Sequence, residues 1–176
     1  ILFQGTEITG KSTHEISRLG LGRTFQNIKL FNALTVEENL MVGGHMAYAK
    51  AGIASFFFDI GRANREEKAL KEAAEEILES MKLKDIAKRQ VGGLPYGMLK
   101  MVELARTMMT RPKLILLDEP AAGLNPSERR DLIEILMHIF DNGIDLFLIE
   151  HNMDVVMNIS HKITVINFGS KIAEGT

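Results

Sequence analysis

Hydrophobic positions recur at helical spacing through the middle of the chain. Over residues 65–81 the apolar side chains fall three or four positions apart, and glutamate and lysine fill the positions between them. The members of this stripe are Leu70, Ala73, Ala74, Ile77, Leu78 and Met81. A second stripe runs through residues 98–109 and ends before Pro112, because the residue that precedes a proline disfavours helical backbone. The pattern predicts two amphipathic helices.

Capping residues mark two further helix starts. Thr35 is followed three positions later by Glu38, and Asn125 is followed by Pro126 and Glu128. In a capping box the first side chain accepts a hydrogen bond from the third helical residue, whose acidic side chain reaches back to the cap. Proline is favoured at the first helical position, where it has no intrahelical hydrogen bond to lose. We therefore expect a helix to begin directly after each cap.

The last part of the chain alternates between apolar runs and helical segments. Residues 114–120 read LILLDEP, residues 145–151 read DLFLIEH, and a third run covers residues 161–169. The first two runs are apolar throughout, which is typical of strands in a parallel sheet that is covered on both faces. A short helix is expected over residues 153–160. The pattern predicts an α/β fold with a mostly parallel sheet and a helical insertion in the middle of the chain.

Composition narrows the class of protein. Of the 176 residues, 45% are hydrophobic and 25% are charged, which is the balance of a globular domain with a sizeable core. The formal net charge of −2 gives no support to a nucleic-acid partner. Cysteine is absent, which excludes disulfides and thiolate metal sites. The apolar residues 51–60 form a stretch far shorter than the roughly 20 residues of a membrane-spanning helix, so we expect them to be buried or to face a partner.

Two adjacent carboxylates close the first apolar run. Asp118 and Glu119 follow LILL at the carboxyl end of a strand, where open parallel sheets bind their ligands. Successive side chains point in different directions, so one carboxylate can hold a metal ion while the other faces a nucleophile. In phosphoryl transfer a metal ion neutralises charge on the β- and γ-phosphates, and a carboxylate orients or deprotonates the attacking water. Two solvated acids are the alternative, about equally supported by this pair alone.

A histidine follows the second apolar run. If both strands belong to one parallel sheet, His151 emerges at the same edge as Asp118 and Glu119. An imidazole at that edge can donate a hydrogen bond to a phosphate oxygen and so respond to the presence of a γ-phosphate. A lone histidine is more often structural, but the expected position beside the acidic strand end favours a functional role.

These motifs together resemble those of the ABC ATPases. Four segments occur in the order and spacing of that family, namely LPYGM, LILLDEP, AAGLNP and the strand that ends in His151. Gln26, within RTFQ, resembles the glutamine loop of the family. The resemblance covers nearly the whole chain. RTFQNIKLF, LTVEENLMVG and the long insertion before residue 65 are similar to the branch that imports branched-chain amino acids.

The resemblance implies a role for each matching residue. Asp118 would hold Mg²⁺, and Glu119 would be the catalytic base that acts on the water attacking ATP. Gln26 would touch the metal ion or that water and relay the state of the ATP to a membrane partner. His151 would contact the γ-phosphate. Asn125 would lie in a loop that faces a second copy, at a position where many members of the family carry aspartate.

The segment LPYGM would form the signature loop, which in this family reaches across a head-to-tail dimer to the ATP of the other subunit. It consists of Leu94, Pro95, Tyr96, Gly97 and Met98. A turn at a helix N-terminus suits that role, because free N–H groups and the helix dipole attract phosphate. Pro95 stands where the family commonly has serine and Met98 where it has glutamine, so a hydroxyl, an N–H and an amide are lost. We expect a weaker closed dimer; tolerated substitution with ordinary activity is the alternative.

Residues 5–12 satisfy the phosphate-loop pattern G-x-x-x-x-G-K-S to the letter. The intervening residues, however, include three β-branched ones and a glutamate, whose charge would repel phosphate. The helix that follows is short, and Lys11 lies only 15 positions before Gln26, whereas the family places its loop much further upstream. We interpret the match as accidental and expect the phosphate loop of the family to lie outside these 176 residues. A small kinase that uses Lys11 is therefore disfavoured.

The motifs divide the chain into an ABC-type P-loop NTPase core and an inserted helical subdomain. Residues 1–26 would hold a strand, a turn, a short helix and the glutamine loop, and residues 27–97 would form the helical subdomain that ends in the signature loop. Residues 98–176 would complete the core. The resemblance implies a subunit that binds and hydrolyses ATP with Mg²⁺, pairs with a second ATPase subunit, and powers transmembrane permease subunits from the cytoplasmic face of the membrane.

Two other functions are left open. An ABC ATPase without a transport role would act on DNA or ribosomes and would need a basic groove, which the net charge does not favour. A fragment that binds partners but no nucleotide is favoured by the expected absence of the phosphate loop. The phenylalanines at 56–58 could belong to a partner surface, although core packing explains any one of them equally well.

Overall fold

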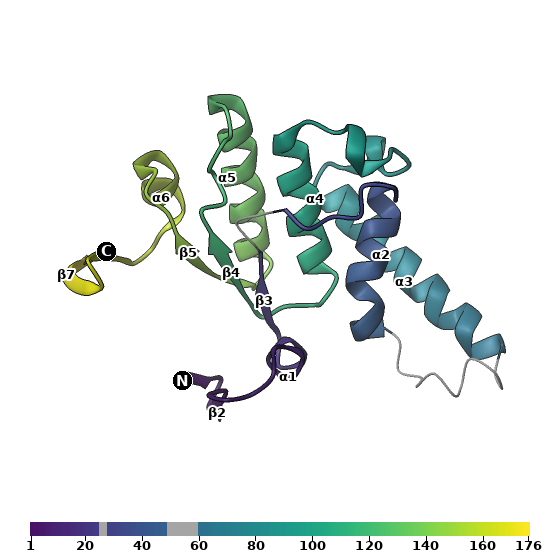
Figure 1. Ribbon diagram of the computed structural model, residues 1–176, viewed down its shortest axis with the longest axis horizontal. Coiled ribbons are helices and arrows are strands. Elements are labelled where there is room, and N and C mark those ends of the chain that lie inside the picture. Colours follow the sequence, from purple (N-terminus) through teal and green to yellow (C-terminus); the bar gives the residue numbers. More distant parts are fainter. Residues whose placement is uncertain (25–27, 49–59) are drawn as a thin grey trace.

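A three-stranded parallel sheet lies at the centre of the computed structural model, which describes residues 1–24, 28–48 and 60–176 (Figure 1). Its strands are β3 (Leu21–Arg23), β4 (Leu114–Asp118) and β5 (Asp145–Ile149), in the order β3-β4-β5. The register pairs Ile115 with Gly22 on one side and with Leu146 on the other. The parallel pairing of the two apolar runs is confirmed, whereas β3 was not predicted because it is only three residues long.

One face of this sheet is packed and the other is open at β5. Ile115 and Leu117 on β4 are almost fully buried. They share one core cluster with the apolar side of helix α5 (Pro126–Asp141), which contacts β5 and presents Leu132, Ile135, Leu136 and Ile139. On the opposite face of β5, Phe147 is 57% exposed and Ile149 is 56% exposed. The prediction that both faces are covered is therefore wrong for β5, because no described residue packs closely enough on that face to bury these two side chains.

Three helices form a second layer beside the sheet. They are α2 (Val36–Tyr48), α3 (Ile60–Ser80) and α4 (Tyr96–Met108), and α2 contacts both of the others (Figure 1). Two adjacent glycines allow this close approach. A Cβ atom on Gly43 would lie 2.8 Å from the backbone oxygen of Arg106, and one on Gly44 would lie 2.7 Å from both Leu70 and Met109. Two short 3-10 turns, Lys84–Ile86 and Val91–Gly93, connect α3 to α4.

The predicted capping boxes are both present. The Glu38 carboxylate accepts hydrogen bonds from the backbone N–H (2.7 Å) and hydroxyl (2.8 Å) of Thr35, and the Glu38 N–H donates to the Thr35 hydroxyl at 3.2 Å. Asn125 accepts from the N–H groups of Ser127 and Glu128, while Glu128 accepts from the Asn125 N–H. Helices α2 and α5 therefore begin where the sequence predicts, since each cap satisfies N–H groups that have no intrahelical acceptor.

The Glu38 capping box makes a pH-dependent contribution to stability. Hydrogen bonds from the Thr35 backbone and hydroxyl lower the pKa of Glu38 below its ordinary value of 4.5. Because the folded pKa is the lower one, the contribution is complete above the unfolded pKa and is lost as the pH falls through the folded pKa. We expect Glu38→Gln to lower Tm slightly at pH 7, because glutamine keeps an acceptor but loses the charge, and the difference from wild type to vanish well below pH 4.5. Thermal denaturation at pH 7 and pH 3 measures this, and a difference that is equal at both pH values would contradict it.

The two ends of the chain form small separate hairpins. Near the N-terminus, β1 (Leu2–Phe3) pairs with β2 (Thr6–Glu7), and α1 (Thr13–Arg18) follows. After α6 (Met153–Ile159), β6 (Ile163–Asn167) pairs antiparallel with β7 (Ser170–Gly175), at the outer edge of the molecule in Figure 1. The third apolar run is thus a strand, as predicted, but its partner is β7, which the sequence did not predict. No helix in the described residues is long and apolar enough to cross a membrane.

Candidate functional site

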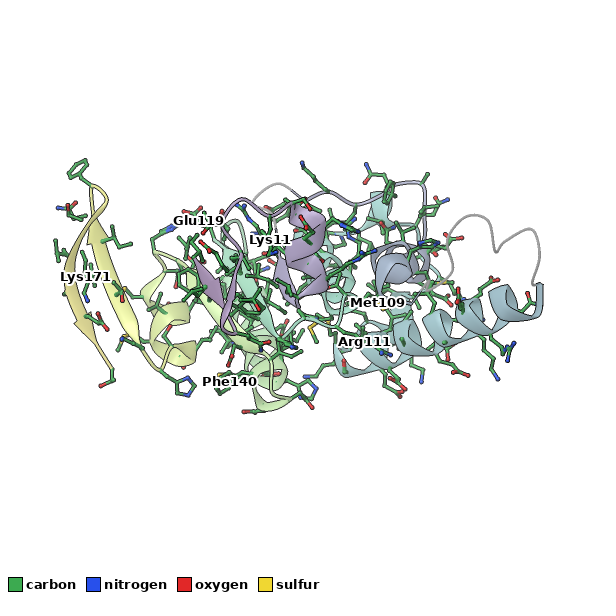
Figure 2. All side chains as sticks on the ribbon, turned by 90° about the horizontal axis from the view of Figure 1, so that it is seen from below. Lys11, Met109, Arg111, Glu119, Phe140 and Lys171 are labelled. Atoms are coloured by element: carbon green, nitrogen blue, oxygen red, sulfur yellow. The ribbon has the colours of Figure 1, made fainter. Side chains whose placement is uncertain are left out.

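The carboxyl end of β4 carries the acidic pair that the sequence singled out. Asp118 is the last residue of β4 and pairs with Ile149, and the Glu119 N–H donates to the Ile149 oxygen at 2.9 Å, extending the strand pairing by one residue. Glu119 has φ +46°, in the left-handed region. Figure 2 shows Glu119 well apart from Phe140, which lies near the C-terminal end of α5.

Asp118 faces a basic side chain from the neighbouring strand. Arg23, at the end of β3, places a guanidinium nitrogen 3.6 Å from an Asp118 carboxylate oxygen, and the Asp118 side chain is 34% exposed. Among the described residues there is no group of three or more metal-ligating side chains. A single partly exposed carboxylate nevertheless suits Mg²⁺, which is bound through one or two protein carboxylates together with water and substrate phosphates.

His151 lies beside Glu119, as predicted from the two strand ends. Its Nδ1 atom is 3.4 Å from a carboxylate oxygen of Glu119 and 3.6 Å from one of Glu150. The His151 side chain is 76% exposed, so the imidazole remains accessible from solvent. The structure thus brings Asp118, Glu119 and His151 together at one edge of the sheet. Gln26, and also residues 56–58, lie outside the described residues.

Glu150 is a buried carboxylate that the sequence analysis did not single out. Its side chain is 1% exposed. One carboxylate oxygen accepts from the Ala121 N–H at 3.0 Å, and the other accepts from the N–H groups of His151 (2.8 Å) and Asn152 (3.1 Å). The single sequence signal was a glutamate at the end of an apolar run, which equally fits a solvated strand end. Three backbone donors stabilise the buried charge.

Lys100 reaches the same turn from α4. Its ammonium group donates to the backbone oxygens of Glu119 and Pro120, both at 3.0 Å, and lies 5.5 Å from the centre of the Tyr96 ring. Burial lowers the pKa of Lys100, while the nearby carboxylates of Glu103, Glu150 and Glu119 act in the opposite direction. This contact was not predicted, because Lys100 lies on the second turn of a helix whose sequence pattern indicates only which side chains pack against the core.

A small cavity lies beside Asp118, between α4 and the sheet. Its lining includes Thr24, Lys100, Glu103 and Leu117, and its volume is about 20 Å³. That volume has room for about one water molecule. It cannot hold a nucleotide, so a ligand of that size would have to bind at the open edge of the sheet where Glu119 and His151 are exposed.

The segment LPYGM forms the start of α4, which begins at Tyr96 with Pro95 as its cap residue. Among the described side chains none caps this helix start. Leu94 and Gly97 are buried, whereas Tyr96 is 46% and Met98 is 40% exposed.

The same segment packs against the loop that carries Asn125. A Cβ atom on Gly97 would lie 2.6 Å from the carboxylate carbon of Glu128, and one on Gly123 would lie 2.9 Å from the Tyr96 ring. A side chain at position 97 would displace the Glu128 carboxylate, and at position 123 glycine is favoured by both the φ of +77° and the Tyr96 ring.

Comparison with known proteins identifies the family of this chain. The profile of the ABC transporter family matches residues 1–122. The high-affinity branched-chain amino acid transport ATP-binding protein BraF of Pseudomonas aeruginosa is 42% identical over the whole chain, which spans 69% of BraF. The corresponding LivG protein of Escherichia coli K12 is 38% identical with the same coverage. The chain belongs to the ABC transporter family.

Solved ATP-binding cassettes of the ABC family have the same fold. MJ1267, an ATP-binding cassette of an ABC transporter, superimposes with a TM-score of 0.81 at 35% identity, over 98% of this chain and 67% of MJ1267. Its ADP conformation gives a TM-score of 0.79. The dimeric, post-hydrolysis cassette MJ0796, bound to ADP and phosphate, is 19% identical with a TM-score of 0.77, and this likeness shows the fold alone. The predicted α/β architecture of an ABC ATPase is thus confirmed.

The apparent phosphate loop of residues 5–12 has a different structure from a phosphate cradle. Gly5 forms the tight turn between β1 and β2, with φ +76°, and the next two residues belong to β2. Ser12 caps α1, and its N–H and hydroxyl both donate to the Glu15 carboxylate, at 2.8 and 2.6 Å. That carboxylate takes the position at the helix start where a phosphate would accept these hydrogen bonds. These contacts support the interpretation that the match in this ABC protein is accidental.

Proposed function

We propose that this chain is the nucleotide-hydrolysing part of an ABC importer and that the importer carries branched-chain amino acids. The observation that carries this proposal is the meeting of Asp118, Glu119 and His151 at the carboxyl edge of one parallel sheet. The substrate class is supported by the two relatives described above, whose names state branched-chain amino acid transport. The reaction is hydrolysis of the bond between the β- and γ-phosphates of ATP.

Each residue at the sheet edge has a distinct role in this proposal. Asp118 holds Mg²⁺, which when bound neutralises charge on the β- and γ-phosphates. Glu119 accepts a proton from the attacking water, and its carboxylate is 33% exposed at the open edge. His151 donates a hydrogen bond to a γ-phosphate oxygen. Gln26, outside the described residues, contacts the metal ion or the water and relays the state of the nucleotide.

A second ATPase subunit completes the site in this proposal. The backbone at residues 94–98 would bind the ATP of that subunit, because the start of α4 has N–H groups and a helix dipole suited to phosphate. Asn125 would face the partner across the same interface. The helices of residues 27–97 would contact the transmembrane permease subunits, with the ATPase on the cytoplasmic face of the membrane. Residues 1–26 and 98–176 would form the ATPase core.

The proposal is tested with a longer protein that joins this chain to the phosphate loop, which we expect outside these 176 residues. It is titrated with a fluorescent ATP analogue in the presence of Mg²⁺, and phosphate release is measured. We expect this longer protein to bind Mg-ATP and to release phosphate. Asp118→Asn should weaken Mg-ATP binding by about tenfold, because it removes the charged metal ligand. Absence of both binding and hydrolysis in the wild-type protein that includes this loop would overturn the proposed function.

The same titration tests the apparent phosphate loop. We expect Lys11→Ala to leave the dissociation constant for Mg-ATP unchanged, because the neighbouring Ser12 donors are already bonded to Glu15. If Lys11→Ala abolishes binding that the wild type shows, the match at residues 5–12 is a functional phosphate loop and the accidental interpretation is wrong.

A further inference from the structure

We propose that Lys100 and Glu150 are positioning residues that hold the turn after β4 from two sides and thereby fix Glu119 relative to His151. The inference rests on the proposed function, in which Glu119 accepts a proton from water and His151 contacts the γ-phosphate. Neither Lys100 nor Glu150 touches the reacting atoms in this proposal. Each acts through the backbone of residues 119–121 or 151–152.

The turn needs external support because its backbone is unfavourable. Glu119 lies in the left-handed region with φ +46°, which costs free energy for any residue that has a Cβ atom. Pro120 follows directly, and a proline restricts the backbone of the residue before it to extended conformations. The backbone preference of Glu119, and the restriction that Pro120 places on it, therefore oppose the observed turn. Contacts from other parts of the fold must hold Glu119 in place.

Lys100 supplies the contact on the carbonyl side. Its ammonium group donates to two successive backbone oxygens, those of Glu119 and Pro120, each at 3.0 Å. Hydrogen bonds from a charged donor are stronger than those between neutral groups, and partial burial of the lysine reduces competition from water. Two parallel acceptors on one ammonium fix the direction of both carbonyl groups, and so the direction in which the Glu119 side chain leaves the strand.

Glu150 supplies the contact on the amide side. One of its oxygens accepts from the Ala121 N–H and the other from the N–H groups of His151 and Asn152. A single carboxylate, 1% exposed, thus joins the loop after β4 to the loop after β5. The charges match the peptide groups that they meet, with the cation on carbonyl oxygens and the anion on N–H groups. Because one loop follows Glu119 and the other contains His151, joining the loops fixes the distance of 3.4 Å between His151 Nδ1 and Glu119 Oε1.

The test compares Lys100→Met and Glu150→Gln with the wild-type chain. Methionine keeps the length of the lysine stem but donates no hydrogen bond, and glutamine turns one of the two acceptors into an amide donor that faces an N–H group. Lys100→Arg retains a charged donor and serves as the rescue variant. Lys82→Met is the matched control, because Lys82 is exposed and its ammonium group pairs only with the Glu134 carboxylate on the surface in the part of the chain that the structure describes.

The first measurement is amide hydrogen exchange, which reports the hydrogen bonds that Lys100 and Glu150 make possible in the two loops and does not require catalysis. We expect Glu150→Gln to accelerate exchange of the Ala121, His151 and Asn152 amides by about tenfold or more, with the amide of buried Ile115 unchanged. Lys100→Met should accelerate exchange at Ala121 and Glu119. The two changes combined should act non-additively at Ala121, because both release the same turn. Unchanged exchange at these sites, or equal acceleration at Ile115, would overturn the proposal.

The second measurement separates positioning from binding. We expect Lys100→Met and Glu150→Gln each to lower kcat for ATP hydrolysis by about tenfold or more, with the dissociation constant for Mg-ATP unchanged. Lys100→Arg should recover most of the rate and Lys82→Met should behave as wild type. An unchanged kcat in both variants would overturn the positioning role. If the wild-type protein that includes the phosphate loop hydrolyses no ATP, the proposed function fails. The exchange measurement still decides whether Lys100 and Glu150 hold the turn.

Discussion

Glu119→Gln is expected to lower kcat for ATP hydrolysis by about 100-fold or more while Mg-ATP binding is retained. Glutamine has nearly the same shape as glutamate, so the turn held by Lys100 and the strand pairing with Ile149 should persist. The amide, however, cannot accept a proton from the attacking water. Binding should be preserved because Asp118, not Glu119, carries the metal ion in the proposed site. Single-turnover phosphate release measures the rate, and titration with the fluorescent analogue measures the binding.

The matched control for this variant is Glu134→Gln on the exposed side of α5. Glu134 forms a surface ion pair with Lys82 at 3.1 Å, and removing its charge far from the sheet edge should leave kcat unchanged. His151→Ala provides a second comparison, because it removes the proposed phosphate contact but leaves the base in place. If Glu119→Gln slows hydrolysis only about twofold, the proton is taken by another group and the role given to Glu119 is wrong.

The sequence predicted the arrangement at the sheet edge because that arrangement follows from topology. Two apolar runs without alternation indicate neighbouring parallel strands, and parallel strands end at one edge. Asp118, Glu119 and His151 were therefore expected together, and the contact of 3.4 Å between the last two confirms their proximity. Helix starts were also predicted, because a capping box is a local signal that involves residues only three positions apart.

Other parts of the site could not be predicted, since they depend on contacts between distant segments. Lys100 reaches Glu119 across 19 positions and Glu150 reaches Ala121 across 29 positions, and no motif in the sequence assigned a role to either residue. Strand β3, with three residues, is too short to show the alternation of side chains that marks a strand in a sequence. The exposure of Phe147 on β5 was also missed, because an apolar run does not reveal which of its faces another element covers.

Asn39→Ala is expected to lower the free energy of unfolding by about 3 kcal/mol. Asn39 is fully buried in α2, and its amide both accepts from the Phe31 N–H at 2.9 Å and donates to the backbone oxygens of Phe31 (3.1 Å) and Thr35 (2.9 Å). Alanine would leave the Phe31 N–H and the buried end of α2 without the hydrogen bonds of this amide, although the Phe31 oxygen would keep the hydrogen bond from the Leu34 N–H at 3.0 Å. Chemical denaturation measures the change, and Tm should fall by roughly 6–12 °C.

Asn158→Ala is the matched control, because Asn158 is also helical but exposed. Its amide donates to the Asp154 oxygen at 2.6 Å, one turn earlier in α6. Both substitutions change asparagine to alanine within a helix and so gain the same helix propensity, which leaves burial and the lost hydrogen bonds as the difference. Equal stability changes in the two variants would contradict the argument. Because Asn39 joins the segment from residue 28 onward to α2, its loss should destabilise that segment while Mg-ATP binding at the sheet edge remains unchanged.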